Sequence, residues 1–144
     1  MRHVASLMLA AAAITACGTS EATTTAPATK VVVGRSQFGS MLFNGKRQAI
    51  YVFSADSPRK SNCYGGCARA WPPVYTSGKP RAGGGVQTSL LGTARRKDGR
   101  LQVTYAGRPL YYYADEGPGQ VLCHDVNLNG GIWKVVVPSG RPRR

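Results

Sequence analysis

The chain contains an internal repeat, and this repeat restricts its fold more than any other feature of the sequence. Each copy holds an aromatic segment, an aspartate, a cysteine and a tryptophan in the same order. The first copy carries Tyr51, Phe53, Asp56, Cys63 and Trp71, and the second carries Tyr111, Tyr113, Asp115, Cys123 and Trp133. The tyrosine precedes the cysteine by twelve positions in both copies. Two copies of one motif predict two similar modules.

The aromatic segments have the pattern of strands that bury one face. Residues two apart in a strand point to the same side, so Tyr51 and Phe53 share a face, as do Tyr111 and Tyr113. Each ring buries roughly 150–250 Å². We therefore expect these rings to form a core, with the two tryptophans packed against them, rather than a ligand platform. The aspartate that ends each segment is suited to accept backbone N–H bonds from the following turn.

Strand-forming residues dominate the rest of the domain, where helix formers are few and Gly, Thr, Val and Tyr are frequent. The expected strands cover residues 31–33, 41–43, 49–53, 101–105, 110–113 and 132–137. We expect two hairpins, one turning at Asn44-Gly45 and one at Ala106-Gly107. A helical turn at 67–71 should end at Pro72-Pro73. The predicted fold class is all-β, with two similar small antiparallel β modules packed as one compact domain.

Three stretches resemble a known bacterial family. They are the segment 51–56, the pair Cys63 and Cys67, and the sequence Trp71-Pro72-Pro73, and the second copy is similar at 107–113 and 129–133. The family is described as a secreted repeat of unknown function, and its members are predicted lipoproteins with a YxFxxD motif. The chain departs from it in having one residue fewer before Asp115 and in carrying Cys123. The resemblance implies an exported protein and no settled activity.

The first sixteen residues match a bacterial secretory signal. A basic start at 1–3 precedes an apolar run at 4–14, which is shorter than the roughly 20 residues that span a membrane. Residues 14–17 resemble the lipobox of bacterial lipoproteins, in which the cysteine receives the lipid. We therefore expect a lipoprotein signal peptide at 1–16 and a lipid anchor at Cys17.

The remaining chain divides by composition. Residues 17–30 are rich in Thr, Ala, Ser and Pro and are expected to form a flexible tether. The repeat-containing β domain should cover 31–138, with copy one at about 31–90 and copy two at about 91–138. Residues 139–144 form a basic tail that we expect to be frayed.

The charge of the chain constrains its partners. Lysine and arginine number 19 against 6 acidic residues, a net charge of +13. Outside the cytoplasmic membrane the available polyanions are lipid headgroups and wall polymers, so these are the expected partners, with the membrane itself contacted through the lipid. Nucleic acid is not expected, because no nucleic-acid motif is present and the aromatic residues do not interleave with the arginines.

Three cysteines remain besides Cys17, and their pairing is open. Gly65-Gly66 permits a tight loop, which favours a disulfide between Cys63 and Cys67. A Cys63–Cys123 bridge across the copies and the absence of any bridge are the alternatives. Cys63, Cys67, Cys123 and His124 could instead bind Cu(I) or Zn(II), or support thiol redox chemistry.

Catalytic signatures are missing from the sequence. His124 is the single imidazole after signal removal, acids are few, and no hydrolase, zinc-protease or phosphate-loop motif occurs. We therefore expect no enzyme activity and no cofactor. The predicted function is that of an extracytoplasmic, lipid-anchored envelope protein with a non-catalytic binding or scaffolding role. The alternative is a metal-binding or redox-active envelope lipoprotein.

Overall fold

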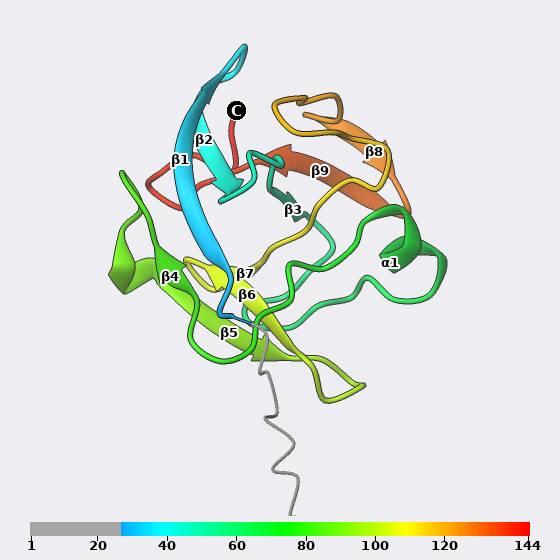
Figure 1. Ribbon diagram of the computed structural model, residues 1–144. Coiled ribbons are helices and arrows are strands. Elements are labelled where there is room, and N and C mark those ends of the chain that lie inside the picture. Colours follow the sequence, from blue (N-terminus) through cyan, green and yellow to red (C-terminus); the bar gives the residue numbers. More distant parts are fainter. Residues whose placement is uncertain (1–26) are drawn as a thin grey trace, which may run out of the picture.

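The computed structural model describes residues 27–144 (Figure 1). The predicted signal peptide, Cys17 and the tether as far as residue 26 lie outside the described residues. The elements are β1 (Lys30–Ser36), β2 (Gly39–Asn44), β3 (Tyr51–Phe53), α1 (Gly66–Ala70), β4 (Arg81–Ala82), a 3₁₀ turn (Thr88–Leu90), β5 (Leu91–Arg95), β6 (Leu101–Tyr105), β7 (Arg108–Pro109), β8 (Val126–Leu128) and β9 (Gly131–Val135). The predicted all-β class is confirmed, and α1 confirms the predicted helical turn.

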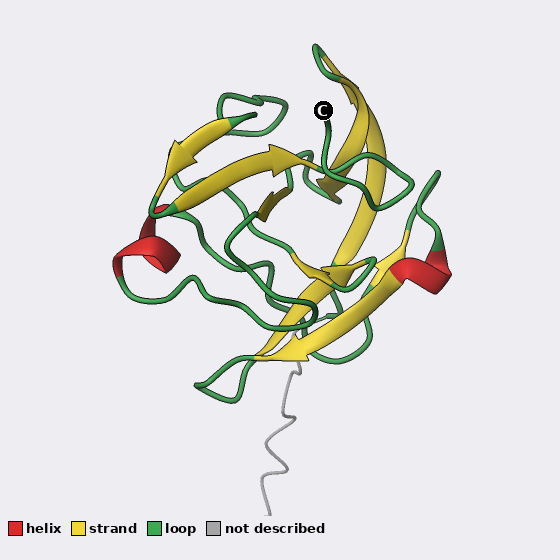
Figure 2. Cartoon of the chain, turned by 180° about the vertical axis from the view of Figure 1, so that it is seen from behind, coloured by secondary structure: helices red, strands yellow, loops and turns green. Residues whose placement is uncertain are grey.

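The strands form three small sheets, visible in yellow in Figure 2. Their orders are β2-β1-β4, β3-β9-β8 and β5-β6-β7. All pairs are antiparallel except the short β1–β4 pair. The β1–β2 hairpin belongs to the first copy and the β5–β6 hairpin to the second, so each copy contributes one long hairpin.

The two copies exchange segments. Strand β3 of the first copy pairs with β9 of the second, with Phe53 opposite Trp133. In return, Pro73 of the first copy bridges to Tyr111 of the second. Each tryptophan segment therefore lies beside the aromatic segment of the other copy. The modules are intertwined, and neither contains all of its own partners.

The two copies are related by an approximate twofold symmetry, and Tyr51 and Tyr111 lie on either side of its centre. The backbone N–H of Tyr51 donates to the carbonyl of Tyr111 at 2.8 Å, and the N–H of Tyr111 donates back at 2.9 Å. The bonds beside this pair repeat in both copies: Ile50 donates to Leu42 as Leu110 donates to Val103, and Leu42 donates to Val136 as Val103 donates to Val74. The internal repeat of the sequence is thus a repeat of backbone hydrogen bonding.

The first predicted hairpin is only partly correct. Residues 41–43 and 49–53 meet at a single bridge between Phe43 and Ala49, and β3 then leaves to pair with β9. The main ladder of β2 is with β1, where Phe43 lies opposite Val32. All three residues of β3 are buried, with Val52 facing one hydrophobic cluster and its neighbours facing the other. A strand buried on both faces lies inside the molecule, where β9 supplies its ladder partner.

The predicted strand at 110–113 does not form as a regular strand. Its partner segment contains Pro72 and Pro73, which have no N–H to donate to a ladder. Tyr112 and Ala114 still donate to the carbonyls of Pro72 and Ala70, at 2.8 and 2.9 Å. The ladder is therefore nearly one-sided, which explains why β3 and β9 form strands and their counterparts do not.

Both predicted ends of the domain differ from expectation. Thr29 was placed in the tether, yet its hydroxyl donates to the carbonyl of Tyr75 at 2.6 Å, and Lys30 begins β1. The C-terminal tail returns along β9, where the N–H of Arg143 donates to Val135 at 2.9 Å. The prediction of a frayed tail is therefore wrong, because backbone groups of β9 are open to pairing there.

Four aromatic rings form a continuous row, in which the first three are stacked and Tyr113 packs at a tilt of 41° on the last indole. Their order is Phe53, Trp133, Trp71 and Tyr113, with centroid separations of 4.2, 3.9 and 4.8 Å. The two indoles are nearly parallel, at an interplanar angle of 2°. Since the two copies alternate along the stack, each copy completes the aromatic core of the other.

Tyrosine rings close the stack at its edges. Tyr51 meets Trp71 edge-on at 5.5 Å, and Tyr111 meets Trp133 in the same way at 5.1 Å. All four side chains are fully buried. Edge-to-face and offset-stacked pairs each contribute about 0.5–1.5 kcal/mol beyond area burial. These two tyrosines and two tryptophans are therefore core residues and offer no face to a ligand.

Truncation of a central indole should destabilise the domain strongly. Trp133→Ala is expected to lower the free energy of unfolding by about 3–5 kcal/mol, since it removes a fully buried ring that touches three others. Urea unfolding followed by circular dichroism measures this. The neighbouring exposed residue provides the control, because Ile132→Ala should change stability by no more than about 0.5 kcal/mol. Equal effects of the two substitutions would contradict the assignment.

Candidate functional site

Asp56 connects the two copies. Its carboxylate accepts the hydroxyl of Tyr111 at 2.8 Å and the backbone N–H of Asn62 at 2.7 Å. The second bond orders the turn after the aromatic segment, as expected from the sequence. The first bond joins the carboxylate of one copy to the tyrosine of the other, which the sequence did not indicate.

Glu116, and not Asp115, is the matching carboxylate of the second copy. It accepts the hydroxyl of Tyr51 at 2.5 Å and the N–H of Leu122 at 2.6 Å, whereas Asp115 is exposed. Glu116 follows Tyr111 by five positions, as Asp56 follows Tyr51. The role predicted for Asp115 is therefore wrong, and the tyrosine-to-carboxylate spacing was the signal that identifies Glu116.

The two carboxylates differ in burial, because Glu116 is buried and Asp56 is half-buried. Glu116 is only 6% exposed, and its Oε2 has no hydrogen-bond partner. Burial raises the pKa of Glu116 and of Asp56, and it also raises the pKa of Tyr51 and Tyr111 above their ordinary range. The tyrosines therefore remain protonated donors, and each bond is a clamp between copies.

Arg96 extends the clamp on the Asp56 side. Its guanidinium donates to the Ser61 hydroxyl and the Gln102 side chain, both at 2.8 Å, and to the carbonyl of Cys63 at 2.7 Å. It also stacks over the Tyr64 ring at 4.2 Å. In the sequence, Arg96 is the middle one of three consecutive basic residues at 95–97. Period two in a strand places it on the face of buried Ala94, which was the available signal.

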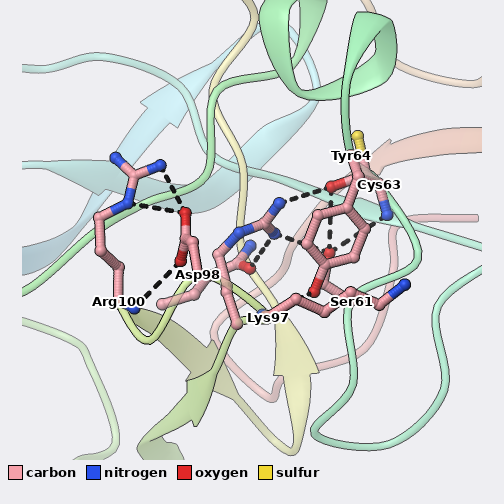
Figure 3. A network of polar contacts seen from close by, with 8 residues as sticks. Ser61, Cys63, Tyr64, Lys97, Asp98 and Arg100 are labelled. Carbon is pink, nitrogen blue, oxygen red and sulfur yellow. Dashed lines mark hydrogen bonds and ion pairs between the residues drawn. The ribbon is translucent and has the colours of Figure 1, made fainter.

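The rest of that basic run stays at the surface. Figure 3 shows Tyr64 and Lys97 beside the Ser61–Cys63 segment, and the Lys97 ammonium lies 4.8 Å from the Tyr64 ring centroid. Arg100 pairs with Asp98 at 2.7 Å, with both side chains largely exposed. These cations already have partners, so this surface is a poor anion site.

The cysteine pairing follows the leading prediction. Cys63 and Cys67 form a disulfide with a Cα–Cα distance of 5.3 Å, so the alternative Cys63–Cys123 bridge is wrong. Gly65 in the enclosed loop has φ +54°, a conformation that favours glycine. Cys123 is free within residues 27–144 and is 8% exposed. Burial, the largest cause, raises the pKa of its thiol and keeps it unreactive.

The alternative metal site does not assemble. Cys63 and Cys67 are bonded to each other, and the part of the chain that the structure describes contains no group of three or more His, Cys, Asp or Glu side chains placed to hold a metal ion. His124 packs on Phe38 at 4.6 Å, and its Nδ1 accepts the N–H of Val135 at 3.3 Å. Burial lowers the pKa of His124, which favours this neutral acceptor form.

A groove with an apolar floor and a basic rim lies along β3 and β9. Its volume is about 370 Å³. It is lined by Val52, Phe53, Ser54, Arg108, Ile132, Lys134, Pro142, Arg143 and Arg144. A second hollow continues from it past Arg141. No acidic residue is among those lining residues, and the sequence analysis missed the site because its cations come from three separate segments. We call it the β9 groove.

The fold and these clamps define an all-β protein of two intertwined repeats around one aromatic core. The chain matches the model of a family described as a secreted repeat of unknown function, over residues 32–75 and 92–137, and it belongs to this family. The matched ranges correspond to the two copies. No curated protein and no solved structure matches the chain. Membership indicates an extracytoplasmic protein, and within the described residues no helix is long and apolar enough to cross a membrane.

Glu116 should make stability depend on pH. Its folded pKa is raised above the ordinary 4.5, so its contribution is fully present below about pH 4.5 and is lost as pH rises through the folded pKa. Urea unfolding at successive pH values should show a smaller decline in Glu116→Gln than in the unaltered protein. Asp115→Asn, an exposed neighbour, should leave the decline unchanged. An equal decline in Glu116→Gln would contradict the assignment.

Thiol counting tests the cysteine arrangement. In a full chain carrying Cys17→Ser, denaturation without reductant should expose one thiol, and the native protein should react at least about a hundredfold more slowly, since Cys123 is buried. A thiol reagent followed by absorbance gives both values. Adding Cys123→Ser should reduce the count to zero, and a count of three would disprove the disulfide.

Proposed function

We propose that this protein is a lipid-anchored, non-catalytic envelope protein whose basic domain binds anionic surfaces outside the cytoplasmic membrane. The membership of an extracytoplasmic family supports the location. The lipobox-like sequence ending at Cys17 supports the anchor, and the net charge of +13 supports the class of partner.

The observation that carries the proposal is the set of unpaired cations at the β9 groove. Arg108, Arg143 and Arg144 are exposed, and no acidic residue lines the groove with them. Elsewhere, Arg96 is buried in hydrogen bonds and Arg100 is paired with Asp98. Exposed guanidinium groups without acidic neighbours attract phosphate-bearing surfaces, and they do so over a distance set by salt.

The use of the reactive side chains favours a non-catalytic role. Asp56 and Glu116 accept the hydroxyls of Tyr111 and Tyr51, and these four groups hold the copies together. The Nδ1 of His124 is engaged by the backbone. A general base needs a free lone pair that faces a substrate. Asp56 and Glu116 face the tyrosine hydroxyls, and the remaining Oε2 of Glu116 is buried. The side chains that could act as acids or bases therefore stabilise the fold.

Membrane fractionation tests the anchor and the charge together. In the native host, the unaltered chain should stay with membranes in 0.5 M salt, because its attachment is apolar. Cys17→Ser should lose that attachment and be released by the salt wash, since screening removes what the charges hold. Immunoblots of the pellet and wash fractions measure both.

Cys123→Ser is the matched control and should behave as the unaltered chain, because this buried thiol carries no lipid. Retention of Cys17→Ser in high salt would overturn the lipid anchor. Complete release of Cys17→Ser at low salt would overturn the charge-driven contact.

A further inference from the structure

We propose that the β9 groove binds a membrane phospholipid, with the phosphate among Arg108, Arg143 and Arg144 and part of an acyl chain along the apolar floor. The inference rests on the proposed function and gives it a specific site.

The floor of the groove is hydrocarbon. Val52 and Phe53 of β3 lie at its base, where they are 4% and 5% exposed, and the more exposed Ile132 and Pro142 border it. Ile132 is 39% exposed, although it lies in the middle of the β8–β9 hairpin. Exposed apolar side chains that gather beside a hollow mark a binding surface. A ligand that fits this floor carries an apolar chain.

The rim of the groove is cationic. Arg108 from β7 lies across from Arg143 and Arg144 of the tail, and Lys134 of β9 is already paired with Asp125 at 3.0 Å. Three guanidinium groups therefore remain for a ligand, and the guanidinium fork matches phosphate oxygens in a two-bond geometry. A ligand that complements the charge of the rim therefore carries an anionic group, such as a phosphate.

The combination of floor and rim selects one occupant. A wall polymer of phosphate and polyol units would satisfy the rim and leave the apolar floor exposed to water. A phospholipid supplies both parts in one molecule, and the membrane is the surface to which the proposed anchor holds the domain. The volume of about 370 Å³ lies within the range of small-ligand sites.

The residues that flank the two tryptophans differ between the copies. The residues on either side of Trp133 are Ile132 and Lys134, whereas those flanking Trp71 are Ala70 and Pro72. The related position therefore lacks both the exposed apolar side chain and the cation. The aromatic core that both copies share does not depend on Ile132 or Lys134. These two groove residues therefore distinguish the second copy from the first.

The anchor leaves this face free to reach the membrane. The chain between Cys17 and Thr29 spans at most about 40 Å, because a residue extends by at most about 3.5 Å. A domain of this size has a radius of gyration near 13 Å, which corresponds to a diameter of roughly 35 Å. The maximum length of the segment between Cys17 and Thr29 is therefore greater than the diameter of the domain. The face that carries the β9 groove can therefore turn toward the bilayer.

Binding of a soluble phospholipid tests the site. The full chain carrying Cys17→Ser is titrated with monomeric dihexanoyl phosphatidylglycerol, and backbone amide shifts are followed by NMR. Saturable shifts should centre on residues 52–54 and 132–134. Adding Arg108→Gln and Arg143→Gln should weaken binding about tenfold or more, and Ile132→Ser should weaken it with an unchanged salt dependence.

The matched control removes two exposed cations outside the groove, Arg69→Gln and Lys79→Gln, and should retain near-normal affinity. Equal loss in both double variants would overturn the groove while leaving general charge-driven binding intact. Inorganic phosphate binding as tightly as the lipid would overturn the apolar part. A glycerol-phosphate polymer binding more tightly at the same residues would replace the phospholipid as occupant. In a separate assay, the chain carrying Cys17→Ser is mixed with anionic phosphatidylglycerol vesicles at low and high salt. Equal binding at both salt concentrations would overturn the proposed function itself.

Discussion

The stacking of Trp71 on Trp133 is the contact on which the rest of the structure depends. Each copy contributes one of the two indoles. Phe53 packs on the outer face of Trp133, and Tyr113 packs on the outer face of Trp71. The copies alternate in this stack, so separating them would expose four rings at once. The buried side chains form two clusters, and the cluster that contains this stack is also the interface between the repeats. The small sheets around it are too short to be stable alone.

The polar contacts follow the same exchange. Each tyrosine donates its hydroxyl to the carboxylate of the other copy, and the two backbones bond reciprocally between the same tyrosines. A buried carboxylate is costly unless it is hydrogen-bonded, so these bonds favour one arrangement of the copies over others. The two sides differ in detail. The Asp56 side is extended by Arg96, whereas the Glu116 side keeps an unpaired oxygen and a buried thiol nearby.

The proposed binding function comes from residues that the repeat does not share. The elements of the core occur twice, but the β9 groove occurs beside one tryptophan, where an exposed isoleucine and several cations border it. Duplication of a β unit explains the stability of the fold. Divergence at the flanks of one tryptophan explains where a ligand would bind. The intertwined core holds both edges of the groove, since β3 comes from the first copy and β9 from the second.

The sequence by itself determined the all-β class and the aromatic core, because these depend on local alternation and on ring burial. It favoured the Cys63–Cys67 disulfide through a short loop containing glycines, and the structure decided between that pairing and its alternatives. The tertiary structure alone decided which copy supplies each partner, because strand exchange depends on long-range pairing that spacing does not encode. It also decided that β3 becomes a strand while 110–113 does not, since this follows from the prolines opposite. Glu116 and Arg96 acquired their roles only when burial brought them beside distant tyrosine and serine hydroxyls. The β9 groove likewise required the fold, because Arg108 precedes Arg143 by 35 positions and the two meet only where the tail returns along β9.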